Sequence, residues 1–346
     1  MTLLKGYLAE VKKQRSRGRC LHYDSGNRCN KIISAHSIQE SGQLRLIEED
    51  GHVYRISSNI STLKKAGGRP QIAKIGVNKV STFDGFCQRH DNELFRLIDN
   101  KLLVPNAVQI SLYAYRCLCR EYFVKENAVR TFNKFLNHEK MSQRLQKLIS
   151  NFHEGSVASF ARLQGIKTTF DKDVKNGNFD QFEYVCFISK AKWNFQLSGV
   201  LYPDYDFLGQ KLQDLLDLPA PLSFITFFTA PVHNGWSFTF AWHKESSKIC
   251  SQFMGSLAAL IHNGGSIEDA LLRFSFTCCE NHAIRISWWD SLTVIQKSSI
   301  LERFAYLIDL KIQVPNTYLA TGLEGIADWH FDHVYSAMRD DKLREF

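Results

Sequence analysis

The chain has 346 residues, of which 44% are hydrophobic and 12% aromatic, and this composition predicts a globular protein of two or three domains. No run of about 18 apolar residues occurs, which excludes a membrane-spanning helix, so we expect no membrane partner. The first residues also lack the apolar stretch of a secretory signal, and we therefore expect a cytoplasmic protein.

The formal net charge of +8 conceals an uneven distribution along the chain. Residues 1–170 hold 28 Lys+Arg against 14 Asp+Glu, a balance of +14, whereas residues 171–346 hold 15 against 21, a balance of −6. Clustered cations gain affinity for nucleic acids by releasing counterions from the phosphates. The basic half is therefore expected to bind DNA or RNA, and a basic surface that is merely solvated is the alternative.

Taken from the amino terminus, residues 1–14 read as a short helix that runs into a cluster of basic side chains. A second basic cluster lies in residues 57–80, whose glycines and lysines predict a flexible loop: either an ordinary mobile loop or a flap that faces phosphates. The predicted nucleic-acid-binding residues are Lys12, Lys13, Arg15, Arg17, Arg19, Lys64, Lys65 and Arg69.

Between these clusters the sequence predicts a knuckle and then a turn. Residues 20–33 carry the turn sequence Asp24-Ser25-Gly26-Asn27, and an extended piece over residues 32–38 follows. The pair Asp50-Gly51 predicts a tight hairpin turn between residues 43–48 and a strand over residues 52–56.

The segment after Phe86 begins a helical pattern, with a cysteine and a histidine in its first turn. A knuckle that supplies two ligands and a helix start that supplies two more form the treble-clef solution for structural zinc. The predicted ligands are Cys20, Cys29, Cys87 and His90, and His22 is the main competing ligand. The remaining cysteines lie in apolar patterns and are interpreted as packing: Cys117, Cys119, Cys186, Cys250, Cys278 and Cys279.

These motifs resemble the zinc-containing HNH (His-Me finger) endonucleases over about residues 17–100. The residues that carry the resemblance are the knuckle, the segment Ala35-His36-Ser37-Ile38, and the run from Phe86 to Asp91. The resemblance implies a metal-dependent nuclease that acts on DNA or RNA. It also suggests a role in bacterial antiphage defence.

Carried over by position, His36 is implied as the general base and Asp91 as a ligand for a catalytic Mg²⁺ or Mn²⁺ ion. Three positions depart from the family pattern: Ala35 stands where a second metal ligand is common, Gln39 falls in the region of the usual proline, and Asn59 is only a candidate for the middle asparagine. A structural role for His36 within the hairpin is the alternative. The second function class is then a catalytically inactive, zinc-stabilised adaptor that binds nucleic acid or protein.

The rest of the chain predicts an α+β architecture. Residues 105–170 show helical spacing, and residues 176–346 combine strands near 184–188, 195–201, 224–228 and 237–242 with helices near 248–262, 267–274 and 293–310. We expect an antiparallel sheet and three domains: residues 1–100, the zinc-braced HNH-like module; 101–175, the basic helices; and 176–346, an acidic domain that senses or binds a protein partner. The cluster of residues 328–333 is interpreted as an aromatic-rich helix surface.

Overall fold

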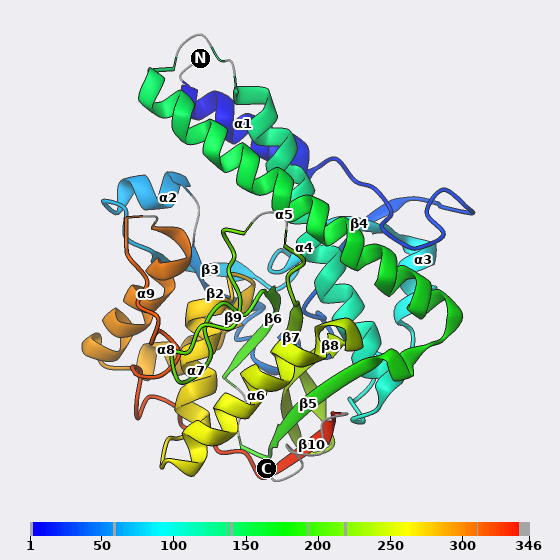
Figure 1. Cartoon of the computed structure of the whole chain (residues 1–346), viewed down its shortest axis with the longest axis vertical. Helices are drawn as coiled ribbons and strands as arrows, with labels where there is room; N and C mark the ends of the chain where they lie inside the picture. Colours follow the sequence, from blue (N-terminus) through cyan, green and yellow to red (C-terminus); the bar gives the residue numbers. More distant parts are fainter. Residues whose placement is uncertain are drawn as a thin grey trace. The chain divides into compact units, whose positions relative to one another are not determined.

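The computed structural model describes residues 3–57, 60–136, 138, 141–191, 194–217, 220–309 and 311–338 (Figure 1). It is a mixed α+β protein that divides into two compact units. Unit 1 comprises residues 1–37, 82–96 and 115–178, and unit 2 comprises residues 38–81, 97–114 and 179–346. Each unit combines segments that are distant along the chain, and the three continuous domains expected from the sequence remain a prediction.

Unit 1 combines a long helical hairpin with a small β-ribbon. Its elements are α1 (Leu3–Arg15), β1 (Ile32–His36), β4 (Thr82–Cys87), α3 (Gln88–Phe95), the part of α4 (Ala107–Phe135) from residue 115, and α5 (Gln143–Asn176). Aromatic pairs join the helices: Tyr7 of α1 packs on Phe132 of α4 with ring centroids 6.3 Å apart, and Phe132 stacks on Phe152 of α5 at 5.7 Å. This apolar seam explains why the three helices lie side by side in Figure 1.

Unit 2 is built on an antiparallel sheet. In the part of the chain that the structure describes, its strand order is β10-β5-β8-β7-β6-β9-β2-β3. The strands are β2 (His52–Ser57), β3 (Gln71–Gly76), β5 (Phe182–Ser189), β6 (Phe195–Leu201), β7 (Ile225–Val232), β8 (Gly235–His243), β9 (His282–Ile284) and β10 (His333–Ala337). The helices are α2 (Ile60–Lys65), α6 (Ser247–His262), α7 (Ile267–Cys278), α8 (Ile286–Ser291) and α9 (Val294–Ile308), with short 3₁₀ turns at Leu44–Leu46, Phe179–Gln181 and Lys244–Ser246.

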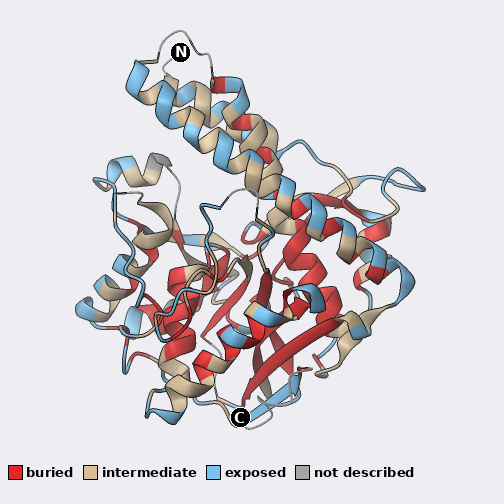
Figure 2. Ribbon diagram, in the orientation of Figure 1, coloured by how far each residue is buried: buried red, intermediate tan, exposed pale blue. Residues whose placement is uncertain are grey.

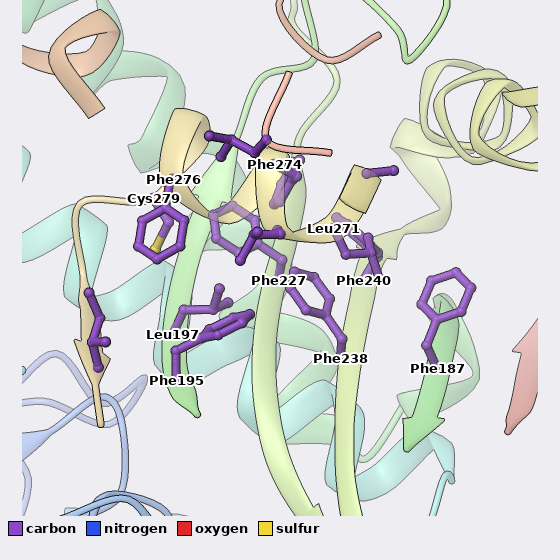
Figure 3. Packing of buried hydrophobic residues seen from close by; sticks show 14 of the residues in the cluster. Phe187, Phe195, Leu197, Phe227, Phe238, Phe240, Leu271, Phe274, Phe276 and Cys279 are labelled. Atoms are coloured by element: carbon purple, nitrogen blue, oxygen red, sulfur yellow. The ribbon is translucent and has the colours of Figure 1, made fainter. Parts of the chain in front are cut away.

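The core of unit 2 lies between the sheet and α7. Phe274 of α7 packs edge-on against Phe227 and Phe240 of the sheet, with ring centroids 4.8 and 5.0 Å apart (Figure 3). The central strands β5 and β7 are buried along their whole length, as Figure 2 shows. Their near-continuous apolar sequences fit this double burial, since a strand with one wet face would alternate polar and apolar residues.

Most of the predicted elements are confirmed. The amino-terminal helix, the helical middle region and the strands and helices of the last half all form at the expected places. The turn after β7 is a two-residue loop, His233–Asn234, in which Asn234 adopts a left-handed φ of 58°. Asparagine adopts this conformation more readily than most other residues with a β-carbon.

Residues 57–80 are not the flexible loop that their glycines and lysines predict. They contain α2 and the edge strand β3, whose register with β2 pairs Ile72 with Ile56 and Ile75 with Val53. Ile72 and Ile75 are three positions apart, a spacing that does not match the two-residue period of a strand or indicate a helix in so short a segment. The strand can therefore be recognised only from its pairing with β2. The prediction of a loop was therefore wrong for these residues.

The predicted hairpin around Asp50-Gly51 forms only at its turn. Both residues have left-handed φ angles, 51° and 73°, and Glu49 and His52 exchange backbone hydrogen bonds across the turn. Leu44–Leu46 before the turn is a 3₁₀ helix rather than a strand, and β2 pairs with β3 and β9 in the large sheet. The strand that carries His36 pairs instead with β4.

A further correction concerns residues 328–333, which do not form the predicted helix surface. Residues 328–332 are irregular, and His333 begins strand β10, which pairs with β5 through a five-residue register. No helix in the described part of the chain is both long and apolar enough to span a lipid bilayer.

Candidate metal centre

Four predicted ligands from three places in unit 1 converge at one point. Cys20 and Cys29 lie at the two ends of the knuckle, Cys87 ends strand β4, and His90 lies in the first turn of α3. One ligand atom from each side chain lies within 4.8 Å of the other three, and no second cluster of three or more such residues occurs in the described part of the chain.

The distances within this cluster fit a tetrahedral zinc ion. Nδ1 of His90 lies 3.4 Å from Sγ of Cys20 and 3.5 Å from Sγ of Cys29. Zinc bonds of about 2.3 Å to sulfur and about 2.0–2.1 Å to nitrogen, at tetrahedral angles, place these atoms about 3.5 Å apart. The Cys₃His set is also one of the donor sets that structural zinc prefers, so these residues fit the ion.

Backbone hydrogen bonds hold the knuckle against β4 and α3. The N–H groups of Arg19 and Leu21 donate to the carbonyl oxygens of Asp84 and Gly85 at 3.0 and 2.8 Å. The N–H of Arg89, at the start of α3, donates to Oδ1 of Asn30 at 3.0 Å. A helix start leaves N–H groups without intrahelical partners, so this contact both caps α3 and fixes the second half of the knuckle.

The local environment shifts the pKa values of Cys20 and Cys87 in opposite directions. Burial raises the pKa of Cys20 to about 12, although N–H groups of Cys87 and His22 act in the opposite direction. Burial also acts to raise the pKa of Cys87, but hydrogen bonds from the N–H groups of His90 and Asn30 and from the neighbouring thiols outweigh it, so the pKa of Cys87 is lowered. The N–H of Gly26 donates to Sγ of Cys29 at 3.3 Å. Such N–H donors stabilise the thiolates that a metal requires.

His22, the competing ligand, lies beside the cluster rather than in it. Its ring stacks on that of His90 with centroids 4.1 Å apart, and its Nδ1 accepts a hydrogen bond from the N–H of Asp24 at 3.0 Å. Burial, followed by the proximity of His90, lowers the pKa of His22 to about 4, so the ring is neutral at physiological pH. His22 therefore contacts the cluster through the ring of His90.

A buried polar network joins the knuckle to the long helices of unit 1. The hydroxyl of Tyr115 donates to Oδ1 of Asp171 at 2.5 Å and lies 3.3 Å from the carbonyl oxygen of Leu21. Nζ of Lys167 donates to both carboxylate oxygens of Asp171 at 2.7 Å. Sequence reasoning missed this network, although Lys167 and Asp171 have the i, i+4 spacing of a helical ion pair.

The two residues implied in catalysis lie on elements adjacent to the metal centre. His36 is the last residue of β1, where it is half-buried and paired with Thr82 at the start of β4. Asp91 is half-buried in the first turn of α3, directly after His90. Asn59, the candidate middle asparagine, lies outside the described residues. The catalytic roles of His36 and Asp91 remain predictions.

The first basic cluster contains two kinds of residue. Lys12, Lys13, Arg15 and Arg17 are exposed at the end of α1 and just after it. Arg19 instead forms a salt bridge with Glu126, donates to Oδ1 of Asn127 at 3.2 Å and lies 4.2 Å above the ring of Phe123.

The second basic cluster belongs to unit 2. Lys64 and Lys65 end α2 and Arg69 precedes β3, and all three side chains are exposed.

The six cysteines predicted to be packing residues lie where that interpretation requires. Five are buried and Cys278 is half-buried. Burial raises the pKa of Cys119 to about 12 and that of Cys186 to about 11, so these thiols stay protonated and behave as small apolar side chains.

No protein-family model, no curated protein and no solved structure matches this chain.

Proposed function

We propose that this protein is a zinc-braced, HNH-like nuclease that hydrolyses phosphodiester bonds in DNA or RNA. The observation that carries the proposal is the sequence of elements around the Cys₃His cluster: β1 ends at His36, β4 pairs antiparallel with β1, and α3 follows β4 at once with Asp91 in its first turn. This order provides a histidine at a strand end and a carboxylate on the following helix.

The chemistry assigned to these residues is general-base hydrolysis. The imidazole of His36 accepts a proton from a water molecule, whose oxygen forms a new bond to phosphorus as the bond to the leaving sugar oxygen breaks. The leaving oxygen takes a proton from solvent. Asp91 would hold a Mg²⁺ or Mn²⁺ ion, which supplies positive charge beside the leaving oxygen.

A cleavage assay tests this proposal. Purified protein is incubated with supercoiled plasmid and with single-stranded RNA in Mg²⁺ or Mn²⁺, beside the variants His36→Ala and Asp91→Asn. Loss of the general base should slow cleavage by about 10²- to 10⁴-fold, with zinc content unchanged. The exposed residue His330 provides a matched control, because His330→Ala should cleave as the wild type does. Cleavage that survives His36→Ala would remove this histidine from the mechanism.

A second candidate function is a zinc-stabilised adaptor that binds nucleic acid without cutting it. The observation that favours it is Ala35, a buried residue with no ligating atom at the place where related nucleases often carry a second metal ligand. This version predicts binding that weakens with salt and no cleavage in any divalent cation. Fluorescence anisotropy with a combined Lys12, Lys13, Arg15 and Arg17 to Gln variant tests it, and unchanged affinity would contradict it.

A further inference from the structure

The β2–α2–β3 segment of unit 2 carries charges of only one sign. Residues 51–81 contain no Asp or Glu. Their six basic residues are Arg55, Lys64, Lys65, Arg69, Lys74 and Lys79. Unit 2 as a whole holds 21 Lys+Arg against 24 Asp+Glu, so the rest of this unit holds 15 against 24. A basic hairpin on an acidic unit is a local electrostatic feature rather than a property of the whole surface.

A pocket of about 380 Å³ lies where β2 begins and β3 ends. Its polar and cationic lining comes from Arg45, His52, Asn78 and Lys79, and the backbone at Gly51 and Gly76 forms another part of its wall. None of the lining residues is acidic. The volume lies in the range of small-molecule sites and exceeds what a phosphate group alone requires.

Backbone contacts hold the pocket in shape. His52 pairs with Gly76 across the two strands, and the N–H of Val77 donates to the carbonyl oxygen of Gly51 at 3.0 Å. The N–H of Lys79 donates to the carbonyl oxygen of Gly76 at 2.9 Å. A β-carbon at Gly76 would lie 3.1 Å from Oδ1 of Asn78, so the glycine leaves room for this tight return of the chain.

Neighbouring groups orient two of the cationic side chains, and Oε2 of Glu48 beside them is buried without a hydrogen-bond partner in the described part of the chain. Arg45 donates to Glu40 at 2.8 Å and to Glu48 at 3.1 Å, which fixes a guanidinium that has five N–H donors in all. Nδ1 of His52 lies 2.7 Å from the carbonyl oxygen of Asp50, which directs Nε2 to the opposite side of the ring.

The carboxylate of Glu49 accepts from the N–H of Ser287 at 2.9 Å and from its hydroxyl. Lys79 is exposed and supplies a positive charge at the pocket.

We propose that this pocket binds one phosphate group of a nucleic-acid backbone, and that the basic hairpin of residues 51–81 binds the phosphates on either side of it. Arginine, lysine and oriented backbone groups are the usual phosphate ligands in proteins. The choice of a nucleic acid as the source of the phosphate rests on the proposed function, whereas the pocket itself does not.

Two binding measurements test the pocket. Fluorescence anisotropy follows a labelled oligonucleotide as salt is varied, and calorimetry follows inorganic pyrophosphate. Lys79→Gln should reduce the slope of log affinity against log salt by about 0.7–0.9, which corresponds to roughly a five- to eightfold loss of affinity at 0.1 M salt. His52→Gln should weaken both ligands as well. Lys211→Gln removes another exposed lysine of unit 2, one that pairs with Asp214, and should bind as the wild type does.

The possible results distinguish a failure of the phosphate pocket from a failure of the proposed function. Parallel loss of oligonucleotide and pyrophosphate binding in Lys79→Gln supports both. Oligonucleotide binding that is equal in the wild type, Lys79→Gln and His52→Gln overturns the pocket and leaves the proposed function standing. Pyrophosphate binding that depends on Lys79 without any oligonucleotide binding supports the phosphate site and overturns the nucleic-acid function. Binding of neither ligand overturns both.

Discussion

The imidazole rings of His22 and His90 stack face to face, with centroids 4.1 Å apart and ring planes 8° from parallel. His90 directs Nδ1 toward the cysteine sulfurs, so the rotation of its ring decides whether that nitrogen can complete the cluster. The pKa of His22 is lowered to about 4 by burial and by its neighbour, and a neutral ring can stack on a metal ligand without charge repulsion. His22 is therefore expected to position His90.

Replacing His22 should show whether the stack matters. His22→Ala removes the ring and should weaken zinc retention by about 10-fold, the low end of the effect of losing an outer-shell partner. His22→Phe keeps an aromatic face and should retain zinc more strongly than the alanine variant. Competition with a chromogenic chelator measures both. Equal retention in the two variants would mean that stacking does not position His90.

The metal itself should be required for stability. Pure protein should contain about one zinc per chain, and Co²⁺ substitution should give the visible bands of a tetrahedral thiolate site. Cys29→Ser should lower both the metal content and the melting temperature. Cys278→Ala, a change at a half-buried cysteine of unit 2, should leave the metal content intact. Metal-free protein with an unchanged melting temperature would contradict a structural role.

Zinc affinity should rise with pH across the neutral range. Burial raises the pKa of the Cys20 thiol to about 12, so this thiol carries its proton until a metal displaces it. Metal binding must then release protons, and lower pH favours the protonated, metal-free form. Chelator competition between pH 6 and pH 8 measures the trend. Affinity that is flat over this range would mean that the thiols are already deprotonated in the metal-free protein.

The ion pair between Lys167 and Asp171 should contribute strongly to the stability of unit 1. Asp171→Asn removes the charge that compensates Lys167, whose side chain is only 9% exposed, and should lower the free energy of unfolding by about 3 kcal/mol. The double variant Lys167→Met with Asp171→Leu removes both charges and should recover part of this loss. Urea denaturation measures each value. A double variant that is less stable than Asp171→Asn would show that charge compensation is not the main contribution.

His282 should make unit 2 sensitive to acid. Its Nε2 accepts the N–H of Ile56 at 3.0 Å and its Nδ1 lies 3.2 Å from the carbonyl oxygen of Cys279, so the folded protein holds it neutral. Burial lowers its pKa to about 3 from an ordinary 6.5. Because the folded pKa is the lower one, the contribution of His282 is complete above pH 6.5 and is lost as the pH falls toward 3.

Denaturation measured at several pH values isolates this effect. Between pH 6.5 and pH 5, His282 should account for an average loss of about 1 kcal/mol per pH unit in the free energy of unfolding. His282→Gln cannot titrate and should show a shallower pH dependence. His330→Gln, at a histidine with a 70% exposed side chain, should follow the wild type. Identical slopes for the wild type and His282→Gln would show that His282 is not the acid-sensitive group.

The Cys₃His cluster could be predicted because its side chains are chemically distinctive. Cysteine and histidine at a knuckle and at a helix start indicate one type of site, and Cys20, Cys29, Cys87 and His90 do converge. The strands of the last half could also be predicted, because long apolar runs such as Phe182–Ser189 give strong local signals.

Features that depend on distant partners could not be predicted in this way. Strand β3 lies at a sheet edge and owes its conformation to pairing with β2, which its own sequence does not reveal. The pairing of β1 with β4 joins residues about 50 positions apart, and neither strand's own sequence reveals its partner. The pocket formed by Arg45, His52 and Lys79 depends on the same long-range pairing.

The discontinuous composition of the two units bears on how the protein can be made and studied. The chain passes from one unit to the other after residues 37, 81, 96, 114 and 178. A fragment ending near residue 100 would contain all four residues of the Cys₃His cluster and yet lack Tyr115, Lys167 and Asp171, which contact the knuckle and one another. Contacts between such distant segments also slow folding. A cut at any of these five points therefore separates segments that belong to one unit, and expression trials are best designed around the intact polypeptide.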